Sequence, residues 1–321
     1  MYKIAIIGSG QLGSRHLQGI KTTDLELSIE VVDSNSESLK TAEKRYNEVE
    51  DNQYNKKIRF LLSLDELSDE LDLVIIATSS APRYAITNEL INKKNVRHIV
   101  FEKVLFQNET HFHEINNLLN SKKIKAWVNC PRRMYDYYNA IRETFKNDNK
   151  IIFNVSGGDW GLGCNSIHFI DIIAYITGQS EYSLLTNGLN RKIYPSKRQG
   201  YIEFCGVLSG VTKRGDFFNF ISNENSTITP IITIINENKK FIIDEAKGFM
   251  VSFNKSWNTQ EVRVPYQSQL TGKVVEDILL NKDIKLTTFE ESIKLHLPFI
   301  SSLLDFYNSI EGNNSKNCPI T

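Results

Sequence analysis

A glycine-rich turn between a strand and a helix constrains this chain more than any other feature. The segment KIAIIGSGQLGSRHLQGI (3–20) places Gly8, Gly10 and Gly13 directly behind a run of apolar, strand-forming residues. The same pattern occurs in plain tight turns that hold no ligand. Here, however, the turn follows a strand, opens a helix and lies within a β–α–β unit. Asp33 ends the next predicted strand 20 residues beyond Gly13, the spacing at which a carboxylate accepts hydrogen bonds from an adenosine ribose.

The loop is therefore predicted to bind a dinucleotide, and each glycine has a physical task. Gly8 permits the sharp turn, Gly10 lets the main chain approach the pyrophosphate, and Gly13 lets helix and strand pack closely. The helix N-terminus adds unpaired N–H groups and partial positive charge for the phosphates. The predicted cofactor-binding residues of this segment are Gly8, Ser9, Gly10, Gln11, Leu12 and Gly13, followed by Asp33.

The identity of the dinucleotide follows from Asp33. Its charge repels a 2′-phosphate, and Ser34 and Asn35 bring no arginine to bind one, so NAD is favoured over NADP. NADP stays open because Arg15 or a nearby lysine can still reach that phosphate. FAD uses the same loop, but the chain lacks the length for the extra domain that most flavin enzymes of this type carry.

The first part of the chain alternates strand and helix. Strands without polar alternation, separated by helices of about ten to fifteen residues, indicate a parallel sheet covered on both faces and wound in the doubly wound manner. Strands are predicted at 3–8, 27–33, 58–63, 71–78, 96–103 and 124–130. Helices are predicted at 12–23, 36–49, 82–94 and 109–123, with a capping box opening a short helix at Ser63.

The pattern changes after residue 150. Apolar strand-like segments then follow one another with little helix between them, which indicates a mostly antiparallel sheet with a turn at 236–240. Helices are predicted at 164–178 and 287–312, and Pro298 inside the second predicts a kink or two helices. The fold class is thus α/β, with an N-terminal Rossmann domain over 1–125. A C-terminal α+β domain with an open, mostly antiparallel sheet is predicted over 126–321.

Composition excludes several classes of function. The net charge of zero gives no electrostatic attraction for nucleic acid or an anionic membrane. The N-terminal apolar run is too short for a signal peptide and no 18-residue apolar segment follows, so a cytoplasmic protein is predicted. The cysteines Cys130, Cys164, Cys205 and Cys318 have no CxxC spacing, which favours reduced thiols and no metal site.

Two polar positions stand out among apolar surroundings. Lys103 lies at the carboxyl end of a predicted parallel strand, where open α/β sheets bind ligands, although such a lysine is often solvated or salt-bridged. His168 and Asp171 share one face of an otherwise apolar helix. A lone histidine there is usually a satisfied core residue, and Asp171 is equally suited to fixing a neighbouring loop.

Taken together, these segments resemble the glucose–fructose oxidoreductase / inositol dehydrogenase family of NAD(P)-dependent enzymes over nearly the full length. The resemblance rests on GSGQLGSRH (8–16), VIIATSSAPRYAITNELI (74–91), FEK (101–103), VNCPRRMYDYY (128–138) and HFIDIIAYITG (168–178). It implies a Rossmann domain, a second domain whose open sheet commonly serves oligomerisation, and hydride transfer at a hydroxyl-bearing carbon of a sugar, cyclitol or sugar nucleotide. It also adds Ala77, Thr78, Glu102 and Lys103 to the predicted cofactor-binding residues.

The catalytic roles are carried over from this resemblance. Lys103 is expected to orient or polarise the reacting oxygen, and His168 to exchange the hydroxyl proton as general acid/base. A cationic Lys103 would stabilise developing alkoxide and favour neutral His168. Both side chains are expected within a few ångströms of one cleft beside the nicotinamide.

Two positions depart from the family. Residue 104 is valine where the family has proline, so the Lys-Pro bond, often cis in the family, is absent, since cis is costly before a non-proline residue. Without this bond, the direction in which the Lys103 side chain points is left open. Cys164 stands where the family often has aspartate, four residues before its histidine. A thiol is a poor charge partner for imidazole, so either Asn165 or Asp171 takes that role, or the chemistry differs.

Substrate clues are few. Arg132 and Arg133 suit a carboxylate or a sugar-nucleotide phosphate, but equally a surface pair. Trp160 suits stacking on a sugar ring or filling core. The segments around them resemble members acting on surface-polysaccharide or nucleotide-sugar precursors. The predicted substrate-binding residues are Arg132, Arg133, Trp160, Asn165 and Asp171.

Three functions fit this pattern. The first is an NAD(P)-dependent oxidoreductase acting on a small sugar-type substrate, forming a homo-oligomer, dimer or tetramer, through the C-terminal sheet. The second is a non-catalytic dinucleotide-binding sensor or regulatory protein of the same fold, which the departures at 104 and 164 favour. The third keeps the enzyme but cycles the bound cofactor internally, so that NAD⁺ is released unchanged.

Overall fold

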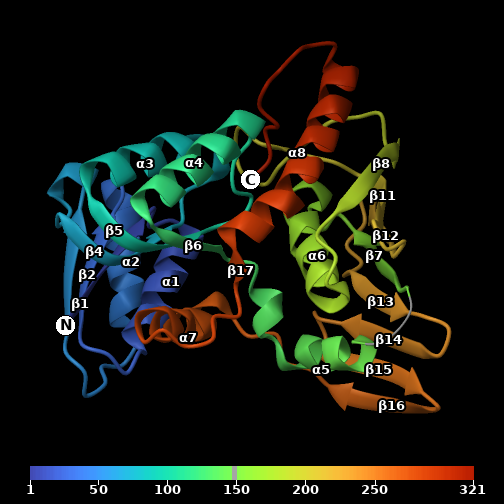
Figure 1. Cartoon of the computed structure of the whole chain (residues 1–321), viewed down its shortest axis with the longest axis horizontal. Helices are drawn as coiled ribbons and strands as arrows, with labels where there is room; N and C mark the ends of the chain where they lie inside the picture. The colour runs from blue at the N-terminus through green and yellow to red at the C-terminus, as the bar shows by residue number, and fades with distance from the viewer. Residues whose placement is uncertain (147–149) are drawn as a thin grey trace. The chain divides into compact units, whose positions relative to one another are not determined.

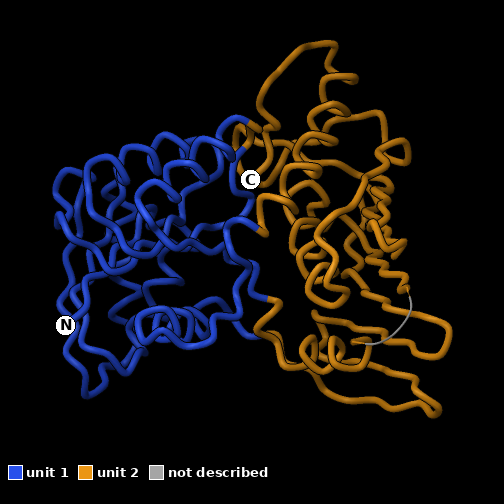
Figure 2. Tube along the Cα trace, in the orientation of Figure 1, with its two compact units in different colours: residues 1–106, 110–131, 265–290 blue, residues 107–109, 132–264, 291–321 orange. Residues whose placement is uncertain are grey.

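The chain divides into two compact units in the computed structural model, which describes residues 1–146 and 150–321 (Figure 2). Unit 1 comprises 1–106, 110–131 and 265–290, and unit 2 comprises 107–109, 132–264 and 291–321. The predicted boundary at 125/126 differs from this division, because 265–290 returns to unit 1.

Unit 1 is built on a seven-stranded sheet in the order β17-β6-β5-β4-β1-β2-β3. Its strands pair in parallel except β17, which is antiparallel to β6, so the predicted doubly wound parallel sheet is confirmed. The strands are β1 (Tyr2–Ile7), β2 (Leu27–Val32), β3 (Lys56–Leu61), β4 (Glu70–Ile76), β5 (Asn95–Phe101), β6 (Lys125–Val128) and β17 (Thr287–Thr288).

Helices cover both faces of this sheet, α3 and α4 on one and α1 and α7 on the other (Figure 1). The helices are α1 (Gln11–Lys21), α2 (Ser36–Asn47), the 3₁₀ turn η1 (Leu64–Glu66), α3 (Ser80–Lys93), α4 (Glu109–Lys122) and α7 (Gln267–Leu279). Ser63 and Glu66 form the predicted capping box at η1. Near-continuous burial of β1 and β4 explains their unbroken apolar sequences.

The sequence analysis missed α7, which joins unit 1 by close backbone packing. A Cβ atom added to Gly272 of α7 would lie 2.7 Å from the Gly19 carbonyl oxygen of α1. Only glycine allows two helices to approach so closely, and β17 then extends the sheet beside β6. These long-range contacts, rather than local pattern, return the chain to unit 1.

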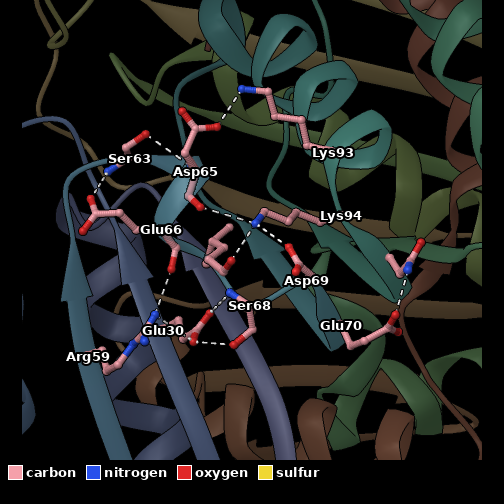
Figure 3. Close-up of polar contacts among 12 residues, drawn as sticks. Glu30, Arg59, Ser63, Asp65, Glu66, Ser68, Asp69, Glu70, Lys93 and Lys94 are labelled. Atoms are coloured by element: carbon pink, nitrogen blue, oxygen red, sulfur yellow. Dashed lines mark hydrogen bonds and ion pairs between the residues drawn. The ribbon is translucent and has the colours of Figure 1, made fainter.

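One buried charge interrupts the apolar strand β2. Glu30 is 2% exposed, and its carboxylate accepts hydrogen bonds from the Ser68 N–H and hydroxyl, both 2.9 Å long. Arg59 lies 3.2 Å from the same carboxylate (Figure 3). Because the charge is paired and hydrogen-bonded, β2 remains a buried strand despite its glutamate.

Unit 2 is built on an eight-stranded sheet in the order β16-β15-β14-β13-β7-β12-β11-β8. Its pairs are antiparallel except β7 with β12, which confirms the predicted mostly antiparallel sheet. The strands are β7 (Ile152–Gly158), β8 (Tyr182–Leu189), β11 (Gly206–Thr212), β12 (Phe217–Asn223), β13 (Ile231–Ile235), β14 (Lys239–Asp244), β15 (Phe249–Asn254) and β16 (Ser256–Glu261). A separate two-stranded pair is formed by β9 (Tyr194–Pro195) and β10 (Ile202–Glu203).

Helices α5 (Asp136–Phe145), α6 (Leu162–Thr177) and α8 (Phe289–Glu311) lie on one side of this sheet, and the 3₁₀ turn η2 (Pro131–Met134) precedes α5 (Figure 1). Helix α8 continues through Pro298, so the alternative of two helices was wrong. The other side of the sheet carries four exposed apolar side chains, Ile152, Leu185, Phe217 and Trp257. Among the described residues, no helix has the length and apolar character needed to cross a membrane.

Candidate functional site

The glycine loop has the geometry that its sequence predicts. Gly8 has φ +91°, a conformation open mainly to glycine, and its N–H donates to the Val32 carbonyl at 2.8 Å. A Cβ atom on Gly13 would lie 1.8 Å from the Gly8 carbonyl oxygen. The predicted tight turn at Gly8 and close packing at Gly13 are therefore confirmed.

Gly10 differs from Gly8 and Gly13 because space lies open beside it. It is the N-cap residue of α1, and no described atom beyond its own chain neighbours lies within 4 Å of a Cβ built on it. The Oγ1 atom of Thr78 is buried without a hydrogen-bond partner among the described residues, and the Thr78 nitrogen would be 2.8 Å from a Cβ on Gly8. An open cradle at a helix N-terminus beside an unsatisfied hydroxyl fits a phosphate-bearing cofactor.

Asp33 lies against this loop. Its Oδ2 atom accepts hydrogen bonds from the Ser9 N–H at 2.7 Å and the Ser9 hydroxyl at 3.0 Å, and Oδ1 accepts from the Asn35 N–H at 2.9 Å. The carboxylate is thus fixed beside the turn with lone pairs remaining for a diol. Of the other predicted cofactor residues, Gln11 accepts from Arg45 at 3.0 Å, and Leu12 is partly exposed.

The loops after β4 and β5 are held together by a buried arginine. Arg83, 1% exposed, donates to the carbonyl oxygens of Thr78, Val104 and Leu105. The Lys103–Val104 peptide bond is cis, so the prediction that valine removes this cis bond was wrong. The backbone is fixed by Arg83 and by the burial of Val104 and Leu105, contacts that the dipeptide sequence does not reveal.

Glu102 belongs to a buried polar network that the sequence analysis missed. Its Oε1 atom lies 2.8 Å from His16 Nε2 and accepts a hydrogen bond from Asn129 at 2.6 Å. His16 Nδ1 lies 2.9 Å from the Thr271 hydroxyl, and Asn129 donates to Gln267 at 2.9 Å. Burial favours the neutral acid, but the bonds from His16 and Asn129 outweigh it and lower the pKa of Glu102. The network joins α1, α7 and the residue before Lys103.

Unit 2 contains a pocket of about 390 Å³ on the side of the sheet that α6 covers. Four predicted site residues line it, so the structure brings them together: Arg132, Trp160, Asn165 and His168. The remaining lining residues, which the sequence analysis did not single out, are Phe169, Pro230, Ile232, Glu245 and Ala246. Lys103 and the cofactor loop belong to unit 1.

Arg132 is held by a carboxylate of the chain itself. Its Nε and Nη2 atoms donate to Glu245 Oε1 and Oε2 at 3.2 and 2.7 Å, and the guanidinium lies 4.6 Å from the Phe169 ring centroid. Tyr137 and Tyr138 donate to Glu245 Oε1 at 2.7 and 3.1 Å. Burial opposes both charges, yet Arg132 lowers the pKa of Glu245, and Glu245 raises that of Arg132. The only sequence signal for Glu245 was its place at the end of a strand.

Arg133 and Asp171, both predicted to bind substrate, pair with each other. Arg133 Nε and Nη2 donate to Asp171 Oδ2 and Oδ1 at 2.8 and 2.9 Å, and Nη1 and Nη2 donate to Glu291 at 3.1 and 2.9 Å. Asp171 is 1% exposed, and Arg133 is 6% exposed. This geometry favours the alternative in which Asp171 is a structural partner, joining α6 to η2 and α8.

The first turn of α6 donates hydrogen bonds to a carboxylate that the sequence analysis missed, Glu203 of β10. Glu203 accepts hydrogen bonds from the N–H groups of Gly163 at 2.7 Å and Cys164 at 3.2 Å. Burial raises its pKa, and these bonds oppose the shift. Asn165 donates to the Trp160 carbonyl at 2.7 Å, and Trp160 donates to the Ile221 carbonyl at 2.8 Å. A carboxylate that belongs to strand β10 therefore lies beside residue 164.

Comparison with protein-family models finds a match for the N-terminal part of the chain. Residues 2–130 match the GFO/IDH/MocA model, described as an oxidoreductase family with an NAD-binding Rossmann fold. This part of the chain is similar to that family. For residues 2–130 the resemblance inferred from the sequence is confirmed, and the matched family is NAD-binding, in agreement with the predicted cofactor. No curated protein matches the chain.

Solved structures extend the similarity to most of the chain. UDP-N-acetylglucosamine 3-dehydrogenase from Acidithiobacillus ferrooxidans is 12% identical, with 93% of this chain and 95% of that chain covered and a TM-score of 0.70. Scyllo-inositol dehydrogenase from Lactobacillus casei, solved with NAD(H) and scyllo-inositol, is 17% identical over 94% and 95%, with a TM-score of 0.66. A super-repressor mutant of Gal80p from Saccharomyces cerevisiae is 14% identical over 99% and 98%, with a TM-score of 0.72. At these identities the similarity shows a shared fold, and it extends over both units of the chain.

The Arg133 ion pair predicts a large effect on stability. Arg133→Met leaves the buried Asp171 carboxylate without its cation, and we expect the free energy of unfolding to fall by about 3–5 kcal/mol. Urea denaturation followed by circular dichroism measures this change. Lys213→Met is the control, since Lys213 and Glu181 form an exposed pair, 72% and 68% accessible, and its loss should change little. An Arg133→Met protein as stable as the wild type would contradict a structural role for the pair.

Proposed function

We propose that the chain is an NAD-dependent oxidoreductase that moves a hydride between nicotinamide and a hydroxyl-bearing or keto carbon of a sugar-type substrate. The observation that carries the proposal is the pocket on α6, where His168 lies with Asn165, Arg132 and Trp160. A concave site with an imidazole, an amide and aromatic walls suits a polyhydroxyl ring. The similarity of residues 2–130 to an NAD-binding oxidoreductase family supports the cofactor part of the proposal.

The proposed roles follow from the chemistry of each side chain. Bound nicotinamide supplies the acceptor or donor of hydride. His168 exchanges the proton of the reacting hydroxyl, because imidazole titrates close to neutral pH. Lys103 polarises the reacting oxygen and stabilises negative charge that develops on it. Asn165 and Trp160 position the ring, and the buried Arg133–Asp171 pair fixes α6.

The cofactor assignment is tested by titration calorimetry with NAD⁺ and NADP⁺. We expect NAD⁺ to bind at least about tenfold more tightly, since Asp33 would face the 2′-phosphate of NADP⁺. Asp33→Ser should weaken NAD⁺ binding and narrow the preference for NAD⁺ over NADP⁺. Asp69→Ser changes a carboxylate that is 87% exposed, and it should leave both the NAD⁺ affinity and this preference unchanged. If neither NAD⁺ nor NADP⁺ produces heat, cofactor binding fails and the proposed function is overturned.

The second candidate function is a dinucleotide-binding regulator without catalysis. The likeness to a Gal80p super-repressor mutant over 99% of this chain favours keeping it, as does Cys164. Such a protein would bind NAD(H) yet exchange no hydride with a panel of sugars, cyclitols and sugar nucleotides. Product analysis distinguishes it from an enzyme whose NAD⁺ is regenerated in each cycle, because net absorbance would not change in either case.

The predicted homo-oligomer and cytoplasmic location stay predictions. The exposed side chains of Ile152, Leu185, Phe217 and Trp257 on the uncovered side of the unit 2 sheet support self-association there. A monomeric mass in light scattering would contradict it.

A further inference from the structure

The charged part of the unit 2 pocket is the Arg132–Glu245 pair. The two side chains are 18% and 16% exposed, so they are largely withdrawn from water while still lining the pocket. Among the nine described lining residues, these two carry the full charges, and they cancel. The pocket therefore offers a ligand a polar surface with no net charge from these residues.

The two oxygens of Glu245 differ in what they already accept. Oε1 accepts from Arg132 Nε, from Tyr137 and from Tyr138, which uses its capacity. Oε2 accepts from Arg132 Nη2 at 2.7 Å, and a carboxylate oxygen has room for another donor. A ligand hydroxyl is the group that can donate there, whereas a ligand carboxylate or phosphate cannot.

An anionic ligand meets a specific obstacle at this pair. To reach the Arg132 guanidinium it must displace Glu245, which leaves a buried carboxylate without its cation. If it does not displace Glu245, two negative groups share one low-dielectric pocket. Either arrangement disfavours the anion relative to a neutral ring of the same shape, and this is the repulsive element that specificity requires.

We infer that Arg132 and Glu245 are specificity-determining residues that select an uncharged polyhydroxyl ring and reject rings bearing a carboxylate or phosphate at the position of the pair. The inference rests on the proposed function, since it assumes that the pocket on α6 holds the substrate. It narrows the predicted substrates to those whose ring is neutral where it enters this pocket.

The test measures binding to the full-length protein with NAD⁺ present, by ligand-observed NMR titration. The neutral probes are D-glucose, N-acetyl-D-glucosamine and scyllo-inositol, and the anionic probes are D-glucuronate and D-glucose 6-phosphate. We expect the wild type to bind a neutral probe at least about tenfold more tightly than either anion. Glu245→Gln keeps the side-chain shape but leaves the positive charge of Arg132 without its carboxylate. The ratio of the dissociation constants for the anionic and neutral probes should therefore shift at least about tenfold in favour of the anions.

Two further variants separate charge from damage to the pocket. Arg132→Gln combined with Glu245→Gln restores zero net charge, and the preference for neutral rings should return. Tyr137→Phe removes one donor to Glu245 and keeps both charges, so the ratio should stay within about twofold of the wild type.

Three outcomes would overturn the inference: a wild type that prefers an anion, a Glu245→Gln protein with an unchanged ratio, or no binding of any neutral probe. Failure of the proposed function looks different. In that case neutral rings bind with the expected preference, but neither the sugars nor NAD⁺ change chemically.

Discussion

Lys103→Ala and His168→Ala are each expected to lower turnover by about two to four orders of magnitude while NAD⁺ still binds. Removing His168 takes away the proposed proton acceptor, and removing Lys103 takes away the proposed charge on the reacting oxygen. Loss of a transition-state contact lowers kcat, whereas loss of a purely structural contact would lower stability and cofactor binding together. The measurement is single-turnover hydride transfer followed by product analysis.

Conservative variants and a control sharpen this experiment. His168→Gln keeps a polar side chain without proton exchange, and Lys103→Arg keeps the charge, so the second should retain more activity than the first. Lys93→Ala is the matched control, because the Lys93 side chain is 46% exposed and pairs with Asp65 and Glu89. Turnover at the wild-type rate in both alanine variants, with NAD⁺ bound, would show that the catalytic assignment is wrong.

Gly13→Ala is expected to abolish measurable NAD⁺ binding and to lower the free energy of unfolding by about 1–3 kcal/mol. The added Cβ would lie 1.8 Å from the Gly8 carbonyl oxygen, so the turn and α1 must separate. Because the neighbour is backbone rather than a flexible side chain, no rotamer change can relieve the overlap. Calorimetry with NAD⁺ and urea denaturation measure the two effects.

Gly10→Ala is the matched comparison, because it separates binding from folding. Space lies open beside Gly10, so its alanine variant should unfold within about 0.5 kcal/mol of the wild type. The methyl group would nevertheless occupy the cradle proposed for the pyrophosphate, and NAD⁺ should bind more weakly. Wild-type affinity in Gly10→Ala would mean that the phosphates do not approach residue 10.

Local patterns were sufficient for most of the Rossmann sheet. Buried parallel strands are apolar throughout, and the glycine spacing and the Ser63 capping box act within a few residues, so each appears directly in sequence. Strand β16 had no such signal, since all six of its residues are exposed and show no apolar alternation. Its existence depends on pairing with β15.

The candidate site was predicted less completely, for a physical reason. His168, Asn165 and Trp160 lie within nine positions of one another, and one helix and its approach bring them together. Glu245 reaches Arg132 across 113 residues, and Glu203 of strand β10 reaches Cys164 of helix α6. Partnerships of this kind are set by sheet register, which a single sequence does not encode in any local pattern.

The return of residues 265–290 to unit 1 has a consequence for how the protein can be dissected. Unit 2 is largely an insertion between β6 and α7, so truncation after residue 131 would remove α7 and β17. The tight glycine contact on α1 and the outer edge of β6 would then face water. A stand-alone nucleotide-binding domain would have to be spliced, with 265–290 rejoined to 131 by a short linker.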